Sequence, residues 1–397
     1  MNKIEETLRN FTNRKEIAGA AVLVRKEGRI VEDFSYGYGD IEKKVPVDRK
    51  TMFRLASMTK PVTAIAVMQL VETGKLGLYD QIKDYIPAFA GQKVCREKVG
   101  DLIYTPDPNS PTGQSINEEK LRNIQYVRAD RDITVFDLLN HSSGLGMGPV
   151  GDTLVKRVIK PEDNVWERAV KYAELPLDFQ PGTASGYSAM AGFEVLAAIV
   201  EKVSGEAYDR YLDKHIFEPL GIRDITYRPS MEQRKRMPRL YEYSQGTLTD
   251  VSDTDEGWSQ MSPIKNTCVS GAAGLIGSME EYEKLAHMLL QKGTLDGIQI
   301  LKSETVEMMA GKGISHKSEM IPGVYWGLGM AVVDKPQTVH LSRSRGSFGW
   351  SGAFGTHFFV DPVNDLEMVL GINRSNIGGA ASVVSFAIED AVRETFL

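Results

Sequence analysis

The sequence predicts an α+β protein in which an antiparallel sheet is built from both ends of the chain and flanked by helices. Hairpin patterns occupy residues 19–38, strand patterns occupy residues 324–370, and helical patterns dominate the residues between them. Strands at both ends and helices in the middle indicate a mainly helical region inserted into a single sheet.

Each end of the chain supplies part of this sheet. Near the N-terminus, residues 3–14 have an amphipathic helical pattern, and two extended segments, 19–25 and 29–38, flank a Lys-Glu-Gly turn. Near the C-terminus, strands are expected at residues 324–333, 355–360 and 366–370, followed by a helix at 380–396.

The middle of the chain carries seven helical patterns separated by irregular loops. They cover residues 62–73, 134–140, 164–174, 189–203, 206–218, 279–291 and 303–310. We therefore expect a discontinuous sheet region formed by residues 1–60 and 315–397, and a mainly helical region with long loops formed by residues 61–314.

The composition is that of a globular protein. The 397 residues include 47 basic and 53 acidic side chains, for a net charge of −6, so neither nucleic acid nor an anionic membrane is an expected partner. The two cysteines, Cys95 and Cys268, match no metal-binding spacing, and no P-loop or His-Glu-x-x-His motif occurs. We expect no cofactor and no metal.

The first residues indicate where the protein acts. Residues 1–8 contain early acids and no long apolar run, unlike a signal peptide. No apolar run elsewhere has the length needed to span a bilayer. The expected location is therefore the cytoplasm.

The strongest candidate nucleophile is Ser57, in the pattern Ser57-Met-Thr-Lys60. Residues 262–265 match the same Ser-x-x-Lys pattern, but only Ser57 stands at the head of a strong helical pattern. Residues three apart on a helix share a face, so Lys60 can reach the Ser57 hydroxyl. A serine there gains a general base, or a cation that tunes one, and a backbone N–H for an oxyanion. The alternative is a serine that only caps the helix.

Two other segments supply the remaining groups that a serine hydrolase needs. Tyr187 follows a Pro-Gly turn and precedes a helix, and a lysine ammonium beside a phenol favours the phenolate. Residues 349–355, Gly-Trp-Ser-Gly-Ala-Phe-Gly, lie just before an expected strand, where close backbone approach is expected. The N–H of Ala353 is a candidate second oxyanion donor. Alternatively, Tyr187 packs a turn and the glycine-rich segment is a plain hairpin.

Together these pieces resemble the serine β-lactamase-like family, which includes class C β-lactamases, low-molecular-weight DD-peptidases and related esterases and acyltransferases. The resemblance covers nearly the whole chain. It rests on residues 53–60 for the nucleophile motif, 137–145 for the Leu-Leu-x-His-x-Ser-Gly-Leu segment, 181–187 for the approach to the tyrosine, and 273–278 for a later glycine-rich turn.

The resemblance implies a β-lactamase/transpeptidase-like fold with the site in the cleft between the two regions. It also implies roles for particular residues. Ser57 would be acylated, and Tyr187 and Lys60 would share the work of the base. The N–H groups of Ser57 and Ala353 would form the oxyanion hole.

Two departures from the class C pattern favour an esterase. Ala189 stands where an asparagine would bind an amide, and Trp350-Ser351-Gly352 replaces the Lys-Thr-Gly that would hold a substrate carboxylate. Tryptophan offers apolar contact instead, as in the carboxylesterases of the family. We therefore expect an enzyme that hydrolyses small carboxylic esters, with Trp350, Ser351 and Gly352 contacting the substrate.

Several alternatives stay open. The enzyme could act on β-lactams or D-alanyl peptides, or transfer the acyl group to a small alcohol or amine. From another class, the chain could be a binding module without catalysis. His141 is expected to be a structural hydrogen-bond partner, and His357 a minor candidate behind the substrate-contacting residues.

Overall fold

The computed structural model describes residues 1–96, 104–106, 114–254, 269–314, 318–338, 342–379 and 382–397. The second Ser-x-x-Lys match, at residues 262–265, and the first two residues of the expected closing helix lie outside these ranges. Within them, no helix has the length and apolar character of a membrane span.

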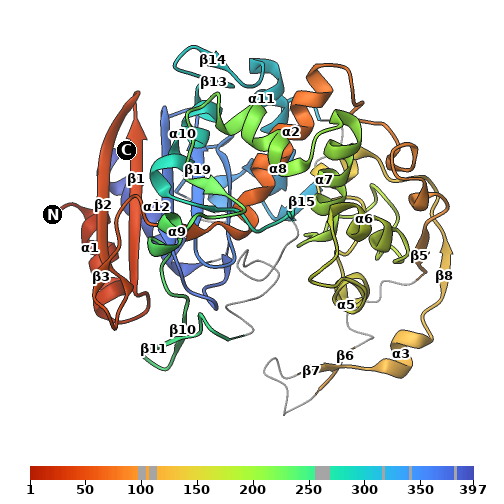
Figure 1. Ribbon diagram of the computed structural model, residues 1–397, viewed down its shortest axis with the longest axis horizontal. Coiled ribbons are helices and arrows are strands. Elements are labelled where there is room, and N and C mark those ends of the chain that lie inside the picture. Colours follow the sequence, from red (N-terminus) through yellow and green to blue (C-terminus); the bar gives the residue numbers. More distant parts are fainter. Residues whose placement is uncertain (97–103, 107–113, 255–268, 315–317, 339–341, 380–381) are drawn as a thin grey trace.

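The main sheet joins the two ends of the chain. Its strand order is β15-β16-β17-β18-β19-β20-β1-β2-β3, and each neighbouring pair is antiparallel. The first three strands are β1 (Gly19–Lys26), β2 (Arg29–Asp40) and β3 (Val45–Pro46). The others are β15 (Ser318–Ile321), β16 (Val324–Trp326), β17 (Ala331–Val333), β18 (Phe348–Ser351), β19 (His357–Asp361) and β20 (Leu366–Ile372). Because β1 lies between β2 and β20, the N-terminal hairpin extends a sheet made by the C-terminal strands (Figure 1).

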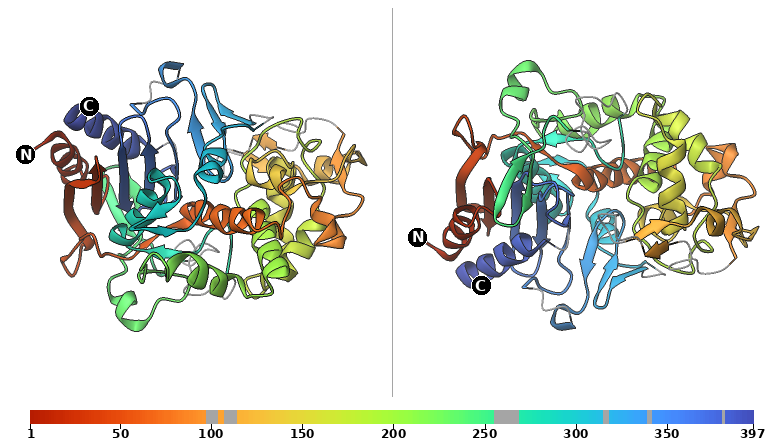
Figure 2. Two further views of the ribbon diagram at one scale, coloured as in Figure 1. Left: turned by 90° about the horizontal axis from the view of Figure 1, so that it is seen from above. Right: turned by 90° about the horizontal axis from the view of Figure 1, so that it is seen from below.

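Helices cover both faces of this sheet. The first and last helices, α1 (Lys3–Asn13) and α12 (Val383–Phe396), pack against each other, as both views of Figure 2 show. Their apolar residues share a core with the side chains that β1 and β20 turn toward them. On the opposite face, α10 (Met279–Leu290) packs on β1, β19 and β20.

The buried helix α2 (Thr59–Glu72) runs through the centre of the molecule (Figure 2). Eleven of its fourteen residues are buried, which explains why its sequence is apolar on most faces. The other helices are α3 (Glu118–Arg122), α4 (Val135–Leu139), α5 (Pro149–Val158), α6 (Val165–Ala173), α7 (Ala191–Ser204), α8 (Tyr208–Leu212), α9 (Met231–Lys235) and α11 (Ser303–Met309), with a π-helical turn at Asp213–Phe217.

Short strands complete the described structure. A three-stranded sheet has the order β4 (Phe53–Arg54), β12 (Ile276–Gly277) and β9 (Ile225–Thr226). Hairpin-like pairs join β5 (Lys93–Cys95) to β8 (Tyr126–Arg128), β6 (Tyr104–Pro106) to β7 (Gln114–Ile116), β10 (Tyr241–Ser244) to β11 (Thr247–Asp250), and β13 (Thr294–Leu295) to β14 (Ile298–Gln299).

The predicted α+β class and the sheet built from both chain ends are confirmed, but two details are wrong. The segment 324–333 is two strands, because Gly327 donates its backbone N–H to Met330 O and the chain reverses between β16 and β17. Residues 349–351, expected to precede a strand, belong to β18, which lies between β17 and β19 inside the sheet. The glycine-rich segment therefore does join two strands as a hairpin, the alternative given for it.

The division of the chain into regions at residues 60 and 314 stays a prediction. Both termini contribute to the sheet as expected. However, α10 lies within residues 61–314 and packs directly on the sheet.

Candidate active site

Ser57 lies in a tightly held turn at the start of α2. A single 3₁₀ turn, Ala56–Met58, leads directly into the helix, and Ala56 has a φ of +45°, a conformation that costs energy for any residue with a side chain. The flanking backbone is fixed because Leu55 donates its N–H to Leu275 O at 2.9 Å and Met58 O accepts from the Tyr282 hydroxyl at 2.9 Å. The strained turn therefore holds the Ser57 side chain in one place.

Lys60 is buried, with 1% of its surface exposed, and contacts three oxygen atoms. Its Nζ donates to Ser57 Oγ at 3.2 Å, to Ala189 O at 2.7 Å and to Ala272 O at 3.0 Å. An ammonium has three donors, and each one has an acceptor here. Two backbone carbonyl groups thus fix the Lys60 amino group beside the serine.

Tyr187 reaches the same serine from a distant loop. Its hydroxyl donates to Ser57 Oγ at 2.7 Å, and its ring lies 5.0 Å from Lys60 Nζ. The three groups predicted to work together therefore meet at a single oxygen atom. Their arrangement provides a nucleophile, a proton acceptor and a fixed positive charge within hydrogen-bonding distance.

His141 holds the tyrosine loop in place. Its Nδ1 accepts the backbone N–H of Ser188 at 3.2 Å, and its carbonyl oxygen accepts the N–H of Gly186. Complete burial, and then the nearby charge of Lys60, lower the pKa of His141 well below its usual value. The ring is therefore neutral and can accept at Nδ1, which confirms the expected structural role.

An aromatic cluster surrounds the tyrosine ring. Trp326 stacks on Tyr187 with a centroid distance of 5.7 Å, and Trp350 lies 5.3 Å from Tyr187 and 4.6 Å from Trp326. The His141 ring lies 4.2 Å from Trp326. Since both tryptophans are more than nine-tenths buried, this wall of the site is apolar and rigid.

The end of β18 approaches the nucleophile turn closely. A Cβ on Gly352 would overlap both Leu55 O and Thr356 Oγ1, so only glycine fits at this position. Thr356 donates its hydroxyl to Leu55 O at 3.2 Å, which ties the turn after β18 to the chain before Ser57. The N–H of Ala353 has no acceptor among the described residues.

Ser351 and His357 lie on the other face of the sheet from Trp350. The Ser351 hydroxyl is 2.6 Å from His357 Nδ1, and both side chains are buried. The predicted contact of Ser351 with substrate stays a prediction, and its side chain is already occupied by a histidine.

Several site residues had no sequence signal. Trp326 looked like one strand residue among many, and the Ala189 and Ala272 carbonyl groups that hold Lys60 are backbone atoms, invisible to a motif. The strained conformation of Ala56 directly before the nucleophile also depends on tertiary packing. Only the Pro-Gly turn and the Tyr-Ser-Ala sequence pointed to the tyrosine loop.

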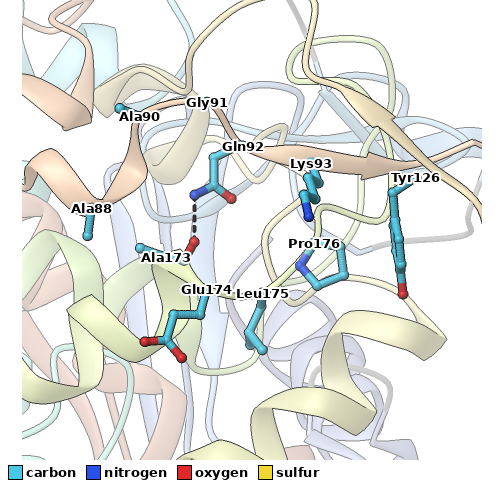
Figure 3. A pocket seen from close by; sticks show the side chains of 10 residues that line it. All are labelled: Ala88, Ala90, Gly91, Gln92, Lys93, Tyr126, Ala173, Glu174, Leu175 and Pro176. Carbon is cyan, nitrogen blue, oxygen red and sulfur yellow. Dashed lines mark hydrogen bonds between the residues drawn. The ribbon is translucent and has the colours of Figure 1, made fainter. Parts of the chain in front are cut away.

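Outside the Ser57 site, the described residues form a further pocket but no candidate metal site. Among residues with described positions, no group of three or more His, Cys, Asp or Glu side chains could hold a metal ion. A pocket of about 280 Å³ lies between the 3₁₀ turn Pro87–Phe89, β5 and the end of α6. Figure 3 shows its lining, with Gln92 donating to Ala173 O at 2.7 Å. None of Ser57, Lys60 or Tyr187 lines it.

Comparisons with known proteins agree with this geometry. A model of the family described as Beta-lactamase matches residues 4–392. Esterase EstB of Burkholderia gladioli is 28% identical over 403 residues, which cover 95% of this chain and 91% of EstB.

Two solved structures have the same fold. The hydrolase EstCE1, described as having promiscuous acyltransferase activity, has a TM-score of 0.79 at 23% identity and matches 98% of this chain and 97% of its own. Simvastatin synthase (LovD) of Aspergillus terreus has a TM-score of 0.77 at 19% identity and matches 99% and 98%. The chain therefore belongs to the Beta-lactamase family of serine hydrolases.

Proposed function

We propose that the protein hydrolyses carboxylic esters through an acyl-enzyme on Ser57. The observation that carries this proposal is the convergence of the Tyr187 hydroxyl and the Lys60 ammonium on Ser57 Oγ, at 2.7 and 3.2 Å. The fold holds both partners within hydrogen-bonding distance of the nucleophile, so no large movement is needed to bring the three groups together.

Acylation follows from this arrangement. Tyr187 acts in its phenolate form, which the neighbouring Lys60 ammonium favours. The phenolate takes the Ser57 proton as Oγ attacks the ester carbonyl. The N–H groups of Ser57 and Ala353 donate to the oxyanion. Collapse of the tetrahedral intermediate releases the alcohol, which receives the proton from Tyr187.

Deacylation uses the same groups in reverse. A water molecule gives a proton to Tyr187 and attacks the acyl carbonyl, and the proton returns to Ser57 as the carboxylic acid leaves. Lys60 is assigned the role of a cation throughout, because the three N–H groups of an ammonium have three acceptors here, Ser57 Oγ, Ala189 O and Ala272 O.

The walls of the site favour esters over lactams and peptides. Ala189 supplies a backbone carbonyl to Lys60 and has no side-chain amide to bind a substrate amide. Trp350 packs on Tyr187 where a lysine would bind a carboxylate. The name of EstB agrees with ester hydrolysis, and its similarity extends over nearly the whole chain.

Acyl transfer to a small alcohol is the second candidate. It is supported by the similarity to EstCE1, a hydrolase described as having promiscuous acyltransferase activity, and to simvastatin synthase. The chemistry differs only in whether water or an alcohol attacks the acyl-enzyme.

One turnover panel tests these assignments. The protein is incubated with p-nitrophenyl butyrate and with nitrocefin, and the ester reaction is repeated with added small alcohols. We expect ester hydrolysis far above nitrocefin turnover. Comparable rates on both substrates would favour a β-lactamase, and a new ester as the main product would favour acyl transfer.

A further inference from the structure

A buried polar chain links the strand that carries Trp350 to the C-terminal helix. Its members are Ser351, His357, Glu389 and Arg343. The Ser351 hydroxyl lies 2.6 Å from His357 Nδ1, His357 Nε2 lies 2.8 Å from Glu389 Oε1, and Arg343 Nε lies 3.0 Å from Glu389 Oε2. Ser351, His357 and Glu389 are each 4% exposed or less.

The alternation of side chains along β18 places this chain behind the active site. Successive residues of a strand point to opposite faces of the sheet. Trp350 contacts Tyr187 on the catalytic face, whereas Ser351 contacts His357 on the face covered by α12. The side chains of the buried polar chain therefore lie on the face of the sheet away from Tyr187 and Ser57. Their effect on catalysis would pass through the backbone of β18.

The charges in the buried polar chain are matched. Burial raises the pKa of Glu389, but the Arg343 guanidinium and the hydrogen bond from His357 outweigh it and hold this pKa below its ordinary value. Glu389 is therefore a carboxylate, and it accepts a hydrogen bond from Nε2 of His357. The other ring nitrogen of His357, Nδ1, is hydrogen-bonded to the Ser351 hydroxyl. A matched set of this kind is rigid, because loss of one member leaves a buried partner unsatisfied.

Ser351 is the last residue of β18 before the turn that carries the Ala353 N–H. Its pairing with His357 is the final one between β18 and β19, and the next residue, Gly352, already donates its N–H across the turn to Thr356 O at 2.7 Å. One residue further, Ala353 carries the N–H that has no acceptor among the described residues. The direction of that N–H thus depends on where Ser351 is held.

We propose that Ser351, His357 and Glu389 are positioning residues that aim the Ala353 N–H at the oxyanion. This inference rests on the proposed function. The turn has two anchors, one on each side of the sheet: Thr356 binds Leu55 O on the side of the nucleophile, and Ser351 binds His357 on the side of α12. Removal of the second anchor lets the N–H move while Ser57, Lys60 and Tyr187 keep their contacts.

The test compares Ser351→Ala with Ser351→Thr, which keeps the hydroxyl, and with Ser347→Ala. Ser347 is a buried serine just before β18 that donates only to Ser344 O, so it is a matched control for the loss of a buried hydroxyl. Glu389→Gln keeps the shape of the acceptor and removes its charge. For each variant, kcat and KM for p-nitrophenyl butyrate are measured with the affinity for a trifluoromethyl ketone, which forms a tetrahedral adduct with the serine.

We expect Ser351→Ala to lower kcat by about 10- to 100-fold, a fraction of what loss of a whole oxyanion donor costs. KM should change by less than about threefold, and the ketone should bind more weakly by the same factor as kcat/KM falls. Glu389→Gln should lie between this variant and the unmodified protein, and Ser351→Thr and Ser347→Ala should keep near-normal kcat.

Different results would overturn different claims. If the unmodified protein is active and Ser351→Ala leaves kcat and ketone affinity unchanged, the positioning role alone is contradicted. The same holds if Ser347→Ala reduces both quantities as much as Ser351→Ala does. If the unmodified protein turns over no ester, the proposed function fails and this inference fails with it.

Discussion

The hydroxyl of Tyr187 lies 2.7 Å from the Oγ of Ser57, although 130 positions separate the two residues in the chain. The tyrosine loop is held by His141, and the serine turn is held by Leu275 and Tyr282. Because each of the two segments is held by its own contacts, the fold itself brings Tyr187 and Ser57 together. It is the contact on which the proposed chemistry depends.

Tyr187→Phe should lower kcat/KM for p-nitrophenyl butyrate by about 10²- to 10⁴-fold, because the ring packing remains while the proton acceptor is lost. Steady-state kinetics with intact thermal stability measure the effect. Tyr36→Phe, which removes an exposed hydroxyl bonded to Asn13, is the matched control and should be unaffected. A loss below tenfold would remove Tyr187 from the role of base.

Lys60→Met should abolish ester turnover and also destabilise the protein by about 1–3 kcal/mol. The substitution keeps the length of the side chain but leaves Ala189 O and Ala272 O without their donor in a buried site. Chemical denaturation gives the stability, and ester turnover gives the activity. Retained turnover would show that the cation is not needed for the chemistry.

Gly352→Ala should lower kcat strongly with little change in the affinity for substrate. A Cβ at this position overlaps Leu55 O and Thr356 Oγ1, so the turn that carries the Ala353 N–H must move away from Ser57. Gly28→Ala serves as a control for substitution at a glycine, since a Cβ there meets open space and only its positive φ is strained. Normal kcat in Gly352→Ala would contradict an oxyanion role for this turn.

A buried acidic cluster predicts how stability depends on pH. Burial, together with the nearby carboxylate of Glu283, raises the pKa of Glu367 from 4.5 to about 7. Contacts with His287 and Arg25 do not cancel this increase. Asp296 lies close enough to Arg25 to interact with its charge. The folded state therefore favours protonated Glu367. Its contribution to stability is complete below pH 4.5 and is lost as the pH rises through about 7.

Glu367→Gln removes this dependence. As the pH increases from 4.5 to 7.5, the free energy of unfolding of the variant should rise relative to that of the unmodified protein. The rise should be at most about 3 kcal/mol, because a pKa shift of one unit corresponds to about 1.4 kcal/mol. Thermal unfolding across this range measures the difference. Exposed Glu27→Gln should show no such trend, and a parallel pH profile for Glu367→Gln would refute the assignment.

The general fold could be predicted from periodicity. The helix expected at 279–291 occurs at Met279–Leu290, and the hairpin at 19–38 occurs as β1 and β2, because each has one face on the core and follows a single period. The prediction of a single strand at 324–333 from the same kind of pattern is wrong. Its glycines were read as part of a strand, although Gly329 adopts a φ of +85° in a reversal.

The site could be predicted only where a local motif carries it. Ser57 and Lys60 are one helical turn apart, so their contact follows from the sequence. The arrival of Tyr187 depends on tertiary structure, and the sequence indicates it only through the Pro-Gly turn before the tyrosine, the helix after it and the family resemblance. Trp326 and Glu389 carried no signal, because their importance comes from strand register and helix packing.

The most direct test of the account is to find the acylated residue. The protein is mixed with an activated ester, quenched with acid within milliseconds and digested, and the acylated peptide is identified by mass spectrometry. The account predicts an acyl group on the Ser57 hydroxyl, formed at a rate that matches turnover and absent in Ser57→Ala. Ester turnover without acylation of Ser57, or with acylation at another residue, would contradict it.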